Sequence, residues 1–318
     1  MRVVTKVFID GQAGTTGLQI SERLAKREDI DLLSISGKHR KDIHARAEMF
    51  EASDIAILCL PDNAAKEAVA IATDKCRIID SSSVHRTTAQ WIYGLPELGG
   101  GQRKAIASAS TVANPGCYPQ GFILLIQPLI DGGFLSAEQL ITVNAISGYS
   151  GGGKALISER QAYSEKDVEL RNTETYGLDL LHKHVPEMAK YSGCKNSPLF
   201  VPTVGHFYQG MIVQIPLFTR NLIGRTKKRE LRNYYMDHYA NEPFVKVIDL
   251  NSQQGKWNGF LNPTSCNETN RLEIMVFGHD DQLLLCARYD NLGKGAAGAA
   301  IQNLNLMIGA EETMGLHV

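Results

Sequence analysis

Residues 3–26 of the chain read VVTKVFIDGQAGTTGLQISERLAK, and this stretch decides the fold class. The apolar run at residues 3–9 predicts a buried strand, and the run at residues 16–26 has the spacing of a helix. A glycine-rich turn at residues 11–17 lies between them. A second strand is expected near residues 31–35, so these segments predict a βαβ unit, in which a helix joins two parallel strands.

The segments that follow repeat this alternation. Residues 54–60 form a short apolar run that ends at Pro61, residues 63–73 have a helical pattern, and residues 77–80 form another apolar run. Short apolar strands that alternate with helices are typical of a parallel sheet covered on both faces. The front of the chain is therefore predicted to be a Rossmann-type, doubly wound α/β domain.

The pattern changes after Pro115. A helix is expected at about residues 118–130, and a strand at residues 140–146. Later strands are expected at residues 211–217, 272–277 and 283–289, the last two joined by a hairpin-like loop. These strands predict an α+β domain with a mostly antiparallel sheet. We place a first domain at residues 1–116, completed by a helical segment at residues 291–318, and a second domain at residues 117–290.

Composition narrows the function classes. The 318 residues include 33 Lys and Arg against 34 Asp and Glu, and a net charge of -1 argues against a nucleic-acid binder and favours small-molecule partners. No stretch approaches the roughly 18 apolar residues that span a bilayer. Thr5, Lys6 and Asp10 interrupt the first apolar residues, which disfavours a signal peptide. The six cysteines form no Cys-x-x-Cys pair, so we expect no disulfide framework and no metal site, and a cytoplasmic location.

The glycine-rich turn predicts a cofactor site. It follows a strand and opens a helix, a context in which backbone N–H groups bind a pyrophosphate. The predicted contacts are Gly11, Gly14, Thr15, Thr16 and Gly17. Its spacing is G-x-x-G-x-x-G rather than the commoner G-x-G-x-x-G, so an ordinary tight turn is the alternative.

The segment Ser36-Gly37-Lys38-His39-Arg40 bears on the choice of cofactor. It lies about twenty residues after the turn, where an NAD enzyme often places an acid on the ribose. The Ser36 hydroxyl and the cations Lys38 and Arg40 favour the 2′-phosphate of NADP instead, and a solvated basic loop is the alternative. Ser81, after the fourth predicted strand, is expected to line the same crevice.

Cys117 is the candidate nucleophile. It lies directly before a predicted helix, and Pro119 suits that helix's first turn. The partial positive charge of a helix N-terminus stabilises a thiolate. The other five cysteines look structural. A small core residue is the alternative for Cys117 as well.

Two histidines and a carboxylate lie close together in His182-Lys183-His184-Val185-Pro186-Glu187. A reactive cysteine needs such a set, an imidazole to exchange protons and an acid to orient it. His206 is a rival base on a strand-like segment, and the residues themselves do not decide between the candidates. A polar loop before Pro186 is the alternative.

The loop at residues 148–155 has the pattern G-x-x-x-x-G-K after a predicted strand. A nucleoside-triphosphatase P-loop needs Ser or Thr after the lysine, and Ala155 breaks that pattern. Backbone N–H groups and Lys154 can still bind a substrate phosphate. We therefore expect an anion-binding loop here. Residues 156–172 and 251–269 carry no readable motif.

Six segments together resemble the N-acetyl-gamma-glutamyl-phosphate reductase family, in its shorter form, over nearly the whole chain. They are Gly11–Gly17, Tyr93-Gly94-Leu95-Pro96-Glu97, Asn114-Pro115-Gly116-Cys117-Tyr118-Pro119, Ser147-Gly148-Tyr149-Ser150-Gly151-Gly152-Gly153-Lys154, the segment from His182 to Glu187, and Asp290-Asn291-Leu292-Gly293-Lys294-Gly295-Ala296-Ala297-Gly298. The resemblance implies an NADP-dependent cytoplasmic enzyme of arginine biosynthesis. It also implies a homo-oligomer, a dimer or a tetramer, with catalysis and oligomerisation in the second domain.

The resemblance also implies a mechanism. Cys117 would attack the acyl phosphate and expel phosphate, NADPH would reduce the resulting thioester, and a histidine would supply the proton as the thiohemiacetal collapses. His182 is favoured as this acid/base, His184 comes next and His206 third. Asn291, Gly293 and Lys294 would place the nicotinamide over Cys117, and the alternative is that residues 293–298 only allow close helix packing. The implied substrate contacts are Ser147, Ser150, Lys154, Glu187 and His206.

Two departures from the family pattern concern local contacts. Gly152 and Lys154 stand where the longer form has Ala and Arg, and Gln120 stands where Thr is frequent.

The nearest alternative function is aspartate-semialdehyde dehydrogenase, whose substrate carries a free ammonium that needs a carboxylate partner. A P-loop nucleoside-triphosphatase and a non-catalytic NADP sensor that tolerates Cys117→Ala are the alternatives from other classes.

Overall fold

The computed structural model describes residues 4–249 and 259–318, so part of the predicted motif-free segment 251–269 lies outside the described residues. The described residues divide into two compact units. The first falls within Met1–Gly116 and Ala296–Leu316, and the second within Cys117–Gly295 and His317–Val318. Over the described ranges, no helix combines the length and the apolar character needed to cross a membrane.

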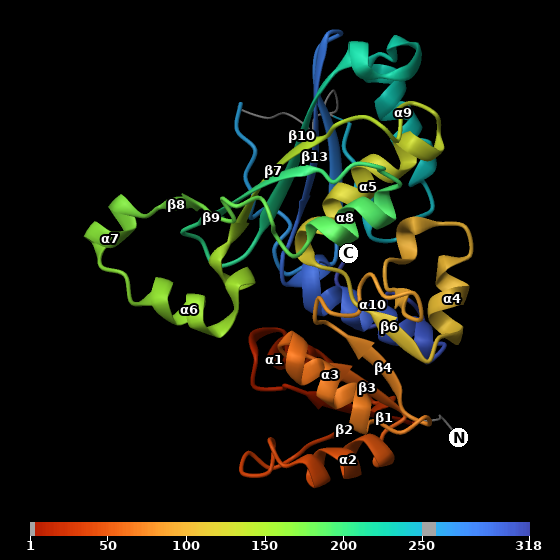
Figure 1. The fold of residues 1–318 in the computed structure, drawn as a ribbon, viewed down its shortest axis with the longest axis vertical. Helices are drawn as coiled ribbons and strands as arrows, with labels where there is room; N and C mark the ends of the chain where they lie inside the picture. The colour runs from red at the N-terminus through yellow and green to blue at the C-terminus, as the bar shows by residue number, and fades with distance from the viewer. Residues whose placement is uncertain (1–3, 250–258) are drawn as a thin grey trace. The chain divides into compact units, whose positions relative to one another are not determined.

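The first unit is built on a parallel sheet of six strands in the order β2-β1-β3-β4-β6-β5 (Figure 1). Its elements are β1 (Thr5–Asp10), α1 (Thr15–Leu24), β2 (Ile30–Leu33), α2 (Ile43–Ala52), β3 (Ile55–Leu58), α3 (Asp62–Ile71), β4 (Arg77–Asp80), β5 (Ile92–Tyr93), α4 (Gln102–Ser108), β6 (Thr111–Ala113) and α10 (Gly298–Met307). The predicted Rossmann-type, doubly wound sheet is confirmed.

Burial explains why these segments pair as parallel strands. All four residues of β3 are buried, because helices cover both faces of the sheet. On one face Phe8 and Phe50 meet edge to face with ring centroids 5.4 Å apart. At the start of β4, the Arg77 guanidinium donates to the carbonyls of Ala107, Ala109 and Met307, which lie at the C-terminal ends of α4 and α10. The Arg77 side chain therefore hydrogen-bonds to carbonyl groups at the ends of two helices.

The second unit contains a mixed sheet in the order β11-β12-β13-β10-β7-β9-β8. Its elements are α5 (Cys117–Asp131), β7 (Thr142–Gly148), α6 (Gly153–Gln161), α7 (Glu165–Leu170), β8 (Thr173–Thr175), α8 (Val185–Ser192), β9 (Leu199–Gly205), β10 (Met211–Phe218), α9 (Lys228–His238), β11 (Val245–Val247), β12 (Leu272–Gly278) and β13 (Gln282–Tyr289). Four neighbouring pairs are antiparallel, and β7 with β9 and β11 with β12 are parallel. The prediction of a mostly antiparallel sheet is confirmed.

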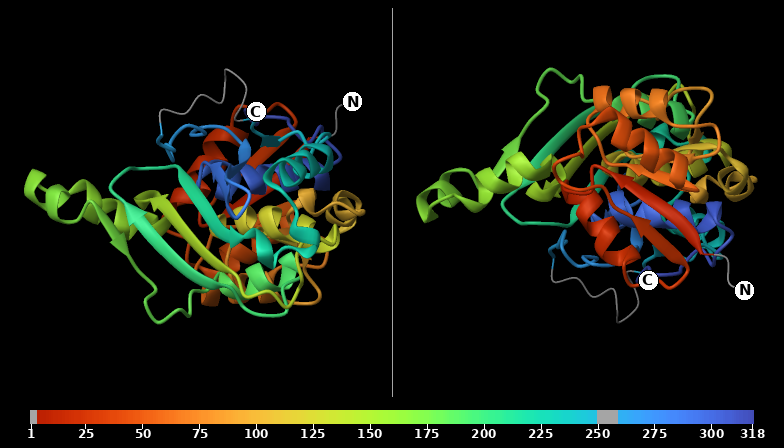
Figure 2. Two further views of the ribbon diagram at one scale, coloured as in Figure 1. Left: turned by 90° about the horizontal axis from the view of Figure 1, so that it is seen from above. Right: turned by 90° about the horizontal axis from the view of Figure 1, so that it is seen from below.

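The helices α5, α8 and α9 lie on one face of this sheet (Figure 1). The segment α6–α7 extends past the edge strand β8, as all views show (Figure 2).

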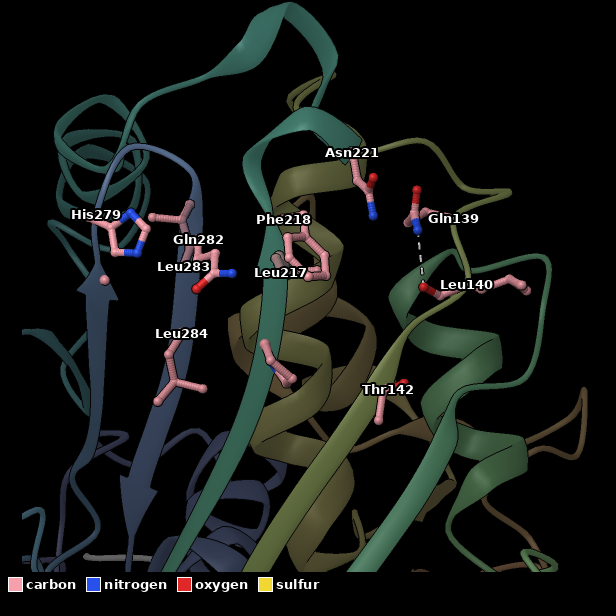
Figure 3. A pocket seen from close by; sticks show the side chains of 12 residues that line it. Gln139, Leu140, Thr142, Leu217, Phe218, Asn221, His279, Gln282, Leu283 and Leu284 are labelled. Atoms are coloured by element: carbon pink, nitrogen blue, oxygen red, sulfur yellow. Dashed lines mark hydrogen bonds between the residues drawn. The ribbon is translucent and has the colours of Figure 1, made fainter.

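On the face turned away from α5, a groove of about 650 Å³ opens among the ends of β7, β10 and β13 (Figure 3). Phe218 and Leu140 line it and are 46% and 75% exposed.

Helix α5 contains Pro128, which has no N–H and leaves the carbonyl of Leu124 without its helical partner. Tyrosines of α9 and its C-cap supply donors to this region. The Tyr239 hydroxyl donates to the Leu124 carbonyl (2.7 Å), and the Tyr234 hydroxyl donates to the Pro128 carbonyl (2.9 Å). Helix α9 thus compensates for the proline inside α5.

Candidate active site

Cys117 is the first residue of α5, and the first turn of this helix is held by β13. The Tyr289 hydroxyl donates to the Cys117 carbonyl (2.6 Å) and accepts from the Gly121 N–H (3.0 Å). A Cβ on Gly121 would lie 2.7 Å from that hydroxyl, so only glycine leaves room for it. The Gln120 amide donates to the Lys294 carbonyl (2.7 Å), which is the local consequence of having glutamine at this position.

The cysteines differ in their surroundings. Burial raises the pKa of Cys59 and Cys286 to about 12 and that of Cys266 to about 11. Burial also raises the pKa of Cys76 and Cys194. These five therefore stay protonated thiols. Cys117 is half-buried and lies at a helix N-terminus, where a thiolate is stabilised.

Three phenols lie within electrostatic range of Cys117. Burial, followed by the charges of Tyr176 and Cys117, raises the pKa of Tyr118 well above its usual value. Burial, followed by the charge of Cys117, also raises the pKa of Tyr289 well above its usual value. Burial is the main cause that raises the pKa of Tyr176 to about 12. The Tyr176 hydroxyl donates to the Tyr118 hydroxyl (3.0 Å). Sequence reasoning missed all three tyrosines as site residues, although Tyr118 and Tyr176 lie close in sequence to predicted ones.

The structure brings His182 and His184 together with Tyr118 and Tyr176. We call the set Tyr118, Tyr176, His182, His184 and Phe200 the aromatic cluster. The His182 ring lies 4.7 Å from the His184 ring, 5.9 Å from that of Tyr118 and 5.1 Å from that of Phe200. Two of the predicted catalytic residues therefore pack against the residue that follows Cys117.

Electrostatics favour the neutral form of His182. Burial lowers the pKa of His182 to about 4, and the charge of Lys183 acts in the same direction. The backbone N–H of His184 donates to Nδ1 of His182 (3.1 Å). Just before this segment, Leu180 has a φ of 61°, an uncommon conformation for a bulky residue.

The predicted substrate residues fall into two groups. Ser147 is buried beside the Tyr118 phenol. Glu187 is buried in the first turn of α8, where its charge adds to burial in raising the pKa of Tyr191 to about 12. Lys154, in contrast, is exposed in the first turn of α6.

Ser150 is tied to a residue predicted to bind cofactor. The Asn291 amide donates to the Ser150 hydroxyl (2.9 Å), and its oxygen accepts from the Gly210 N–H (2.7 Å). Both side chains are buried. Asn291 therefore fixes the loop that carries Ser150. Lys294 is fully buried, with its ammonium 5.9 Å from the Phe244 ring centroid.

His206 lies in another aromatic group. Its ring stacks on Tyr163 (5.7 Å, 3°) and lies 5.7 Å from the Tyr149 ring. Within the described residues, its buried Nδ1 has no hydrogen-bond partner. His206 thus packs against tyrosines on either side of α6, Tyr149 before the helix and Tyr163 after it.

The glycine turn of the first unit has the predicted context. Gly11 has a φ of 90°, and a Cβ there would lie 2.3 Å from the Cys59 carbonyl oxygen. A Cβ on Gly17 would lie 2.5 Å from the Gly11 oxygen. Helix α1 begins at Thr15, followed by Thr16, and its N-cap Gly14 has no side chain to cap the first N–H groups. This cradle fits a pyrophosphate.

The remaining cofactor candidates lie around the same sheet. Ser36, Lys38 and Arg40 are exposed in the turn after β2, and Ser81 follows β4. Sequence reasoning missed the buried pair of Asp10 and Arg46 (2.7 Å) at the end of β1. Burial raises the pKa of Asp10 against the opposing effect of Arg46. No group of three or more metal-ligating side chains occurs in residues 4–249 and 259–318.

Family models match both units. Residues 6–109 match the model described as "Semialdehyde dehydrogenase, NAD binding domain". Residues 117–291 match the model described as "Semialdehyde dehydrogenase, dimerisation domain".

Solved structures share the fold. Aspartate semialdehyde dehydrogenase II of Vibrio cholerae, complexed with ASA, superposes with a TM-score of 0.74 at 17% identity, covering 96% of this chain and 98% of that one. The aspartate semialdehyde dehydrogenase of Francisella tularensis gives a TM-score of 0.70 at 16% identity, with 96% and 100% covered.

Curated relatives are much more similar in sequence. N-acetyl-gamma-glutamyl-phosphate reductase 2 of Nostoc sp. is 48% identical, covering 98% of this chain and 99% of the relative. The N-acetyl-gamma-glutamyl-phosphate reductase of Brucella ovis is 46% identical, with 96% and 99% covered. The chain therefore belongs to the semialdehyde dehydrogenase family and, within it, to the N-acetyl-gamma-glutamyl-phosphate reductases.

Proposed function

We propose that the chain reduces N-acetyl-gamma-glutamyl phosphate to N-acetylglutamate 5-semialdehyde and phosphate with NADPH, a step of arginine biosynthesis. The observation that carries this proposal is the placement of Cys117 at the start of α5, next to the aromatic cluster. The 48% identity to a reductase of that name supports the choice of substrate. We also propose a cytoplasmic location, because Cys117 must stay reduced to react.

Cys117 is the nucleophile of the proposed reaction. Its thiolate attacks the acyl carbon, a C–S bond forms, and the bond from carbon to the phosphate oxygen breaks. The N-terminus of α5 stabilises the thiolate before the attack and after the product leaves. Tyr289 keeps the first turn of α5 in place by bonding to the Cys117 carbonyl.

The acyl group is handled by the aromatic cluster. His182 is the residue we assign to the carbonyl oxygen, with His184 packed against it. We assign Ser147, Ser150 and Lys154 to the phosphate and the α-carboxylate, since they lie close together in sequence, from the end of β7 to the first turn of α6. Glu187 and His206 are the further substrate contacts that we propose.

The first unit is the proposed cofactor site, and a nicotinamide cofactor bound there supplies a hydride. Gly11, Gly14, Thr15, Thr16 and Gly17 would hold the pyrophosphate through backbone N–H groups. We propose NADP rather than NAD because Lys38 and Arg40 offer two exposed cations for a 2′-phosphate, with Ser36 beside them. Ser81, after β4, is proposed as a further cofactor contact of the first unit, and Asn291 is proposed as a cofactor contact contributed by the second unit. We propose that Lys294 contributes to cofactor binding through its backbone, because its side chain is fully buried.

We further propose that the chain forms a homo-oligomer through the sheet face turned away from α5. The groove on this face exposes Phe218 and Leu140, and exposed apolar surface of this kind is typical of subunit interfaces (Figure 3). The family model over residues 117–291 is named a dimerisation domain, which supports this reading. A dimer in which the two sheets face each other is the simplest closed arrangement.

The decisive experiment runs the reaction backward. NADPH formation is followed from N-acetylglutamate 5-semialdehyde, NADP and phosphate, for the wild type, Cys117→Ser and the matched control Cys194→Ser. We expect phosphate-dependent turnover in the wild type and in Cys194→Ser, and loss of at least about 10³-fold in Cys117→Ser. Preference for aspartate semialdehyde would move the assignment to that substrate, and turnover of neither aldehyde would reject the enzymatic proposal.

A further inference from the structure

His182 is held in one tautomer by the backbone. Its Nδ1 accepts a hydrogen bond from the His184 N–H at 3.1 Å. An amide N–H is always a donor, so Nδ1 must present a lone pair, and the proton of the neutral imidazole lies on Nε2. The imidazolium ion carries protons on both nitrogens and cannot accept this bond.

The groups that face the His182 ring also favour its neutral form. Tyr118 comes from α5, Phe200 from β9, and Tyr176 from the segment after β8, and the His184 ring lies 4.7 Å away at the start of α8. The two phenols and the Phe200 ring are uncharged at neutral pH. Of the nearby charges, Lys183 opposes the imidazolium and Asp179 favours it, and burial outweighs both.

The proposed reaction does not require a proton at the carbonyl oxygen. When the thioester forms, phosphate leaves with the electron pair of the broken C–O bond and takes one proton from water. After reduction the former carbonyl carbon carries a hydrogen, and its oxygen is an oxyanion. When this oxyanion collapses, the C=O bond re-forms, the C–S bond breaks, and the electron pair returns to Cys117 as a thiolate. The single proton consumed ends on phosphate.

What the oxygen needs in both tetrahedral states is therefore a hydrogen-bond donor. We propose that neutral His182 donates from Nε2–H to the acyl oxygen of the substrate on Cys117 and keeps its proton throughout the cycle. This rests on the proposed function above. It assigns His182 the role of an oxyanion donor in place of the proton carrier that the family resemblance implies.

Two variants separate these roles. His182→Gln places an amide donor close to the position of Nε2 but cannot exchange a proton, whereas His182→Ala removes the donor. We expect kcat of His182→Gln to stay within about tenfold of the wild type and that of His182→Ala to fall about 10²- to 10³-fold. Equal losses in the two variants would overturn the proposal. His44→Gln, on the exposed surface of α2, is the control.

A second measurement does not depend on turnover. In ¹⁵N-histidine-labelled protein, the His182 signals are assigned by their disappearance in His182→Gln. We expect an unprotonated Nδ1 and a protonated Nε2 at every pH from about 5.5 to 8. A titration within this range, or a proton on Nδ1, would overturn the inference. If the NMR result holds but the wild type turns over no acyl phosphate, the proposed function fails and the tautomer assignment stands.

Discussion

The hydroxyl of Tyr289 bridges the Cys117 carbonyl and the Gly121 N–H, two groups that lie one helical turn apart at the start of α5. A residue on β13 thereby fixes the turn that carries the nucleophile. Tyr289→Phe removes both bonds, and we expect it to lower the free energy of unfolding by about 1–2 kcal/mol and kcat by about tenfold. Urea unfolding and steady-state rates test this. Tyr234→Phe, which loses a bond to the Pro128 carbonyl, should lose stability with kcat intact.

Gly295 lies against Cys117. A Cβ on Gly295 would be 3.1 Å from the Cys117 Cβ, closer than ordinary contact, so the cysteine would have to shift by a few tenths of an ångström. We expect Gly295→Ala to lower kcat about tenfold, because small displacements of a reacting group are costly, and Gly295→Ser to lower it further. The KM for NADP should change little. Wild-type kcat in both variants would contradict this expectation.

We expect the free energy of unfolding to decrease at acidic pH, because His182 must take up a proton there. Its folded pKa of about 4 lies below the usual value of 6.5, so the unfolded chain binds the proton more tightly. The contribution is fully present above pH 6.5 and is lost as the pH falls toward 4. We expect about 1 kcal/mol from this half-buried group, after discounting for solvent. Urea unfolding at both ends of the window measures it, and His182→Gln should reduce the difference.

Lys38 and Arg40 are predicted to select NADP. Replacing both with Ala should raise the KM for NADP about 10- to 100-fold, because two charge-assisted contacts to the 2′-phosphate are lost. The KM for NAD, which lacks this phosphate, should stay within about twofold, so NAD serves as the control cofactor. An equal rise for both cofactors would show that the two cations act on the pyrophosphate or on folding.

Phe218 tests the proposed interface. It is 46% exposed in the groove of the second sheet, and Phe218→Asp would place a charge in an apolar contact between subunits. We expect the variant to sediment as a monomer where the wild type sediments as an oligomer. The matched control is Leu170→Asp, because Leu170 is 71% exposed on α7; this variant should leave the assembly intact. An unchanged sedimentation coefficient in Phe218→Asp would move the interface elsewhere.

The fold was largely predictable because many of its strands are apolar segments, among them β3, β10 and β12. The strand predicted at residues 77–80 has those bounds, and β10, β12 and β13 differ from prediction by one residue at one end. The segment α6–α7 was not predictable. It buries only Arg160, so it has no apolar periodicity to read. Helix α9 is polar and buries only Leu231 and Tyr235, which leaves the same weak signal.

The candidate site divides in a similar way. Cys117 could be singled out because local features, a helix start and Pro119, surround it. Tyr289 could not, because its contact with Cys117 joins residues 172 positions apart and leaves no local pattern. The burial of Lys294 beside the Phe244 ring could not be predicted either, because Phe244 lies far away in the sequence.

Helix α10 has a consequence for synthesis on the ribosome. Asn303 of α10 donates to the Gly94 carbonyl across 209 residues, and Gln302 donates to Glu97 across 205. The first unit therefore stays incomplete until nearly all of the second has been made. The unit that is translated first thus waits for one of the last helices of the chain, so a nascent chain released before α10 emerges would leave the first sheet with one face partly uncovered.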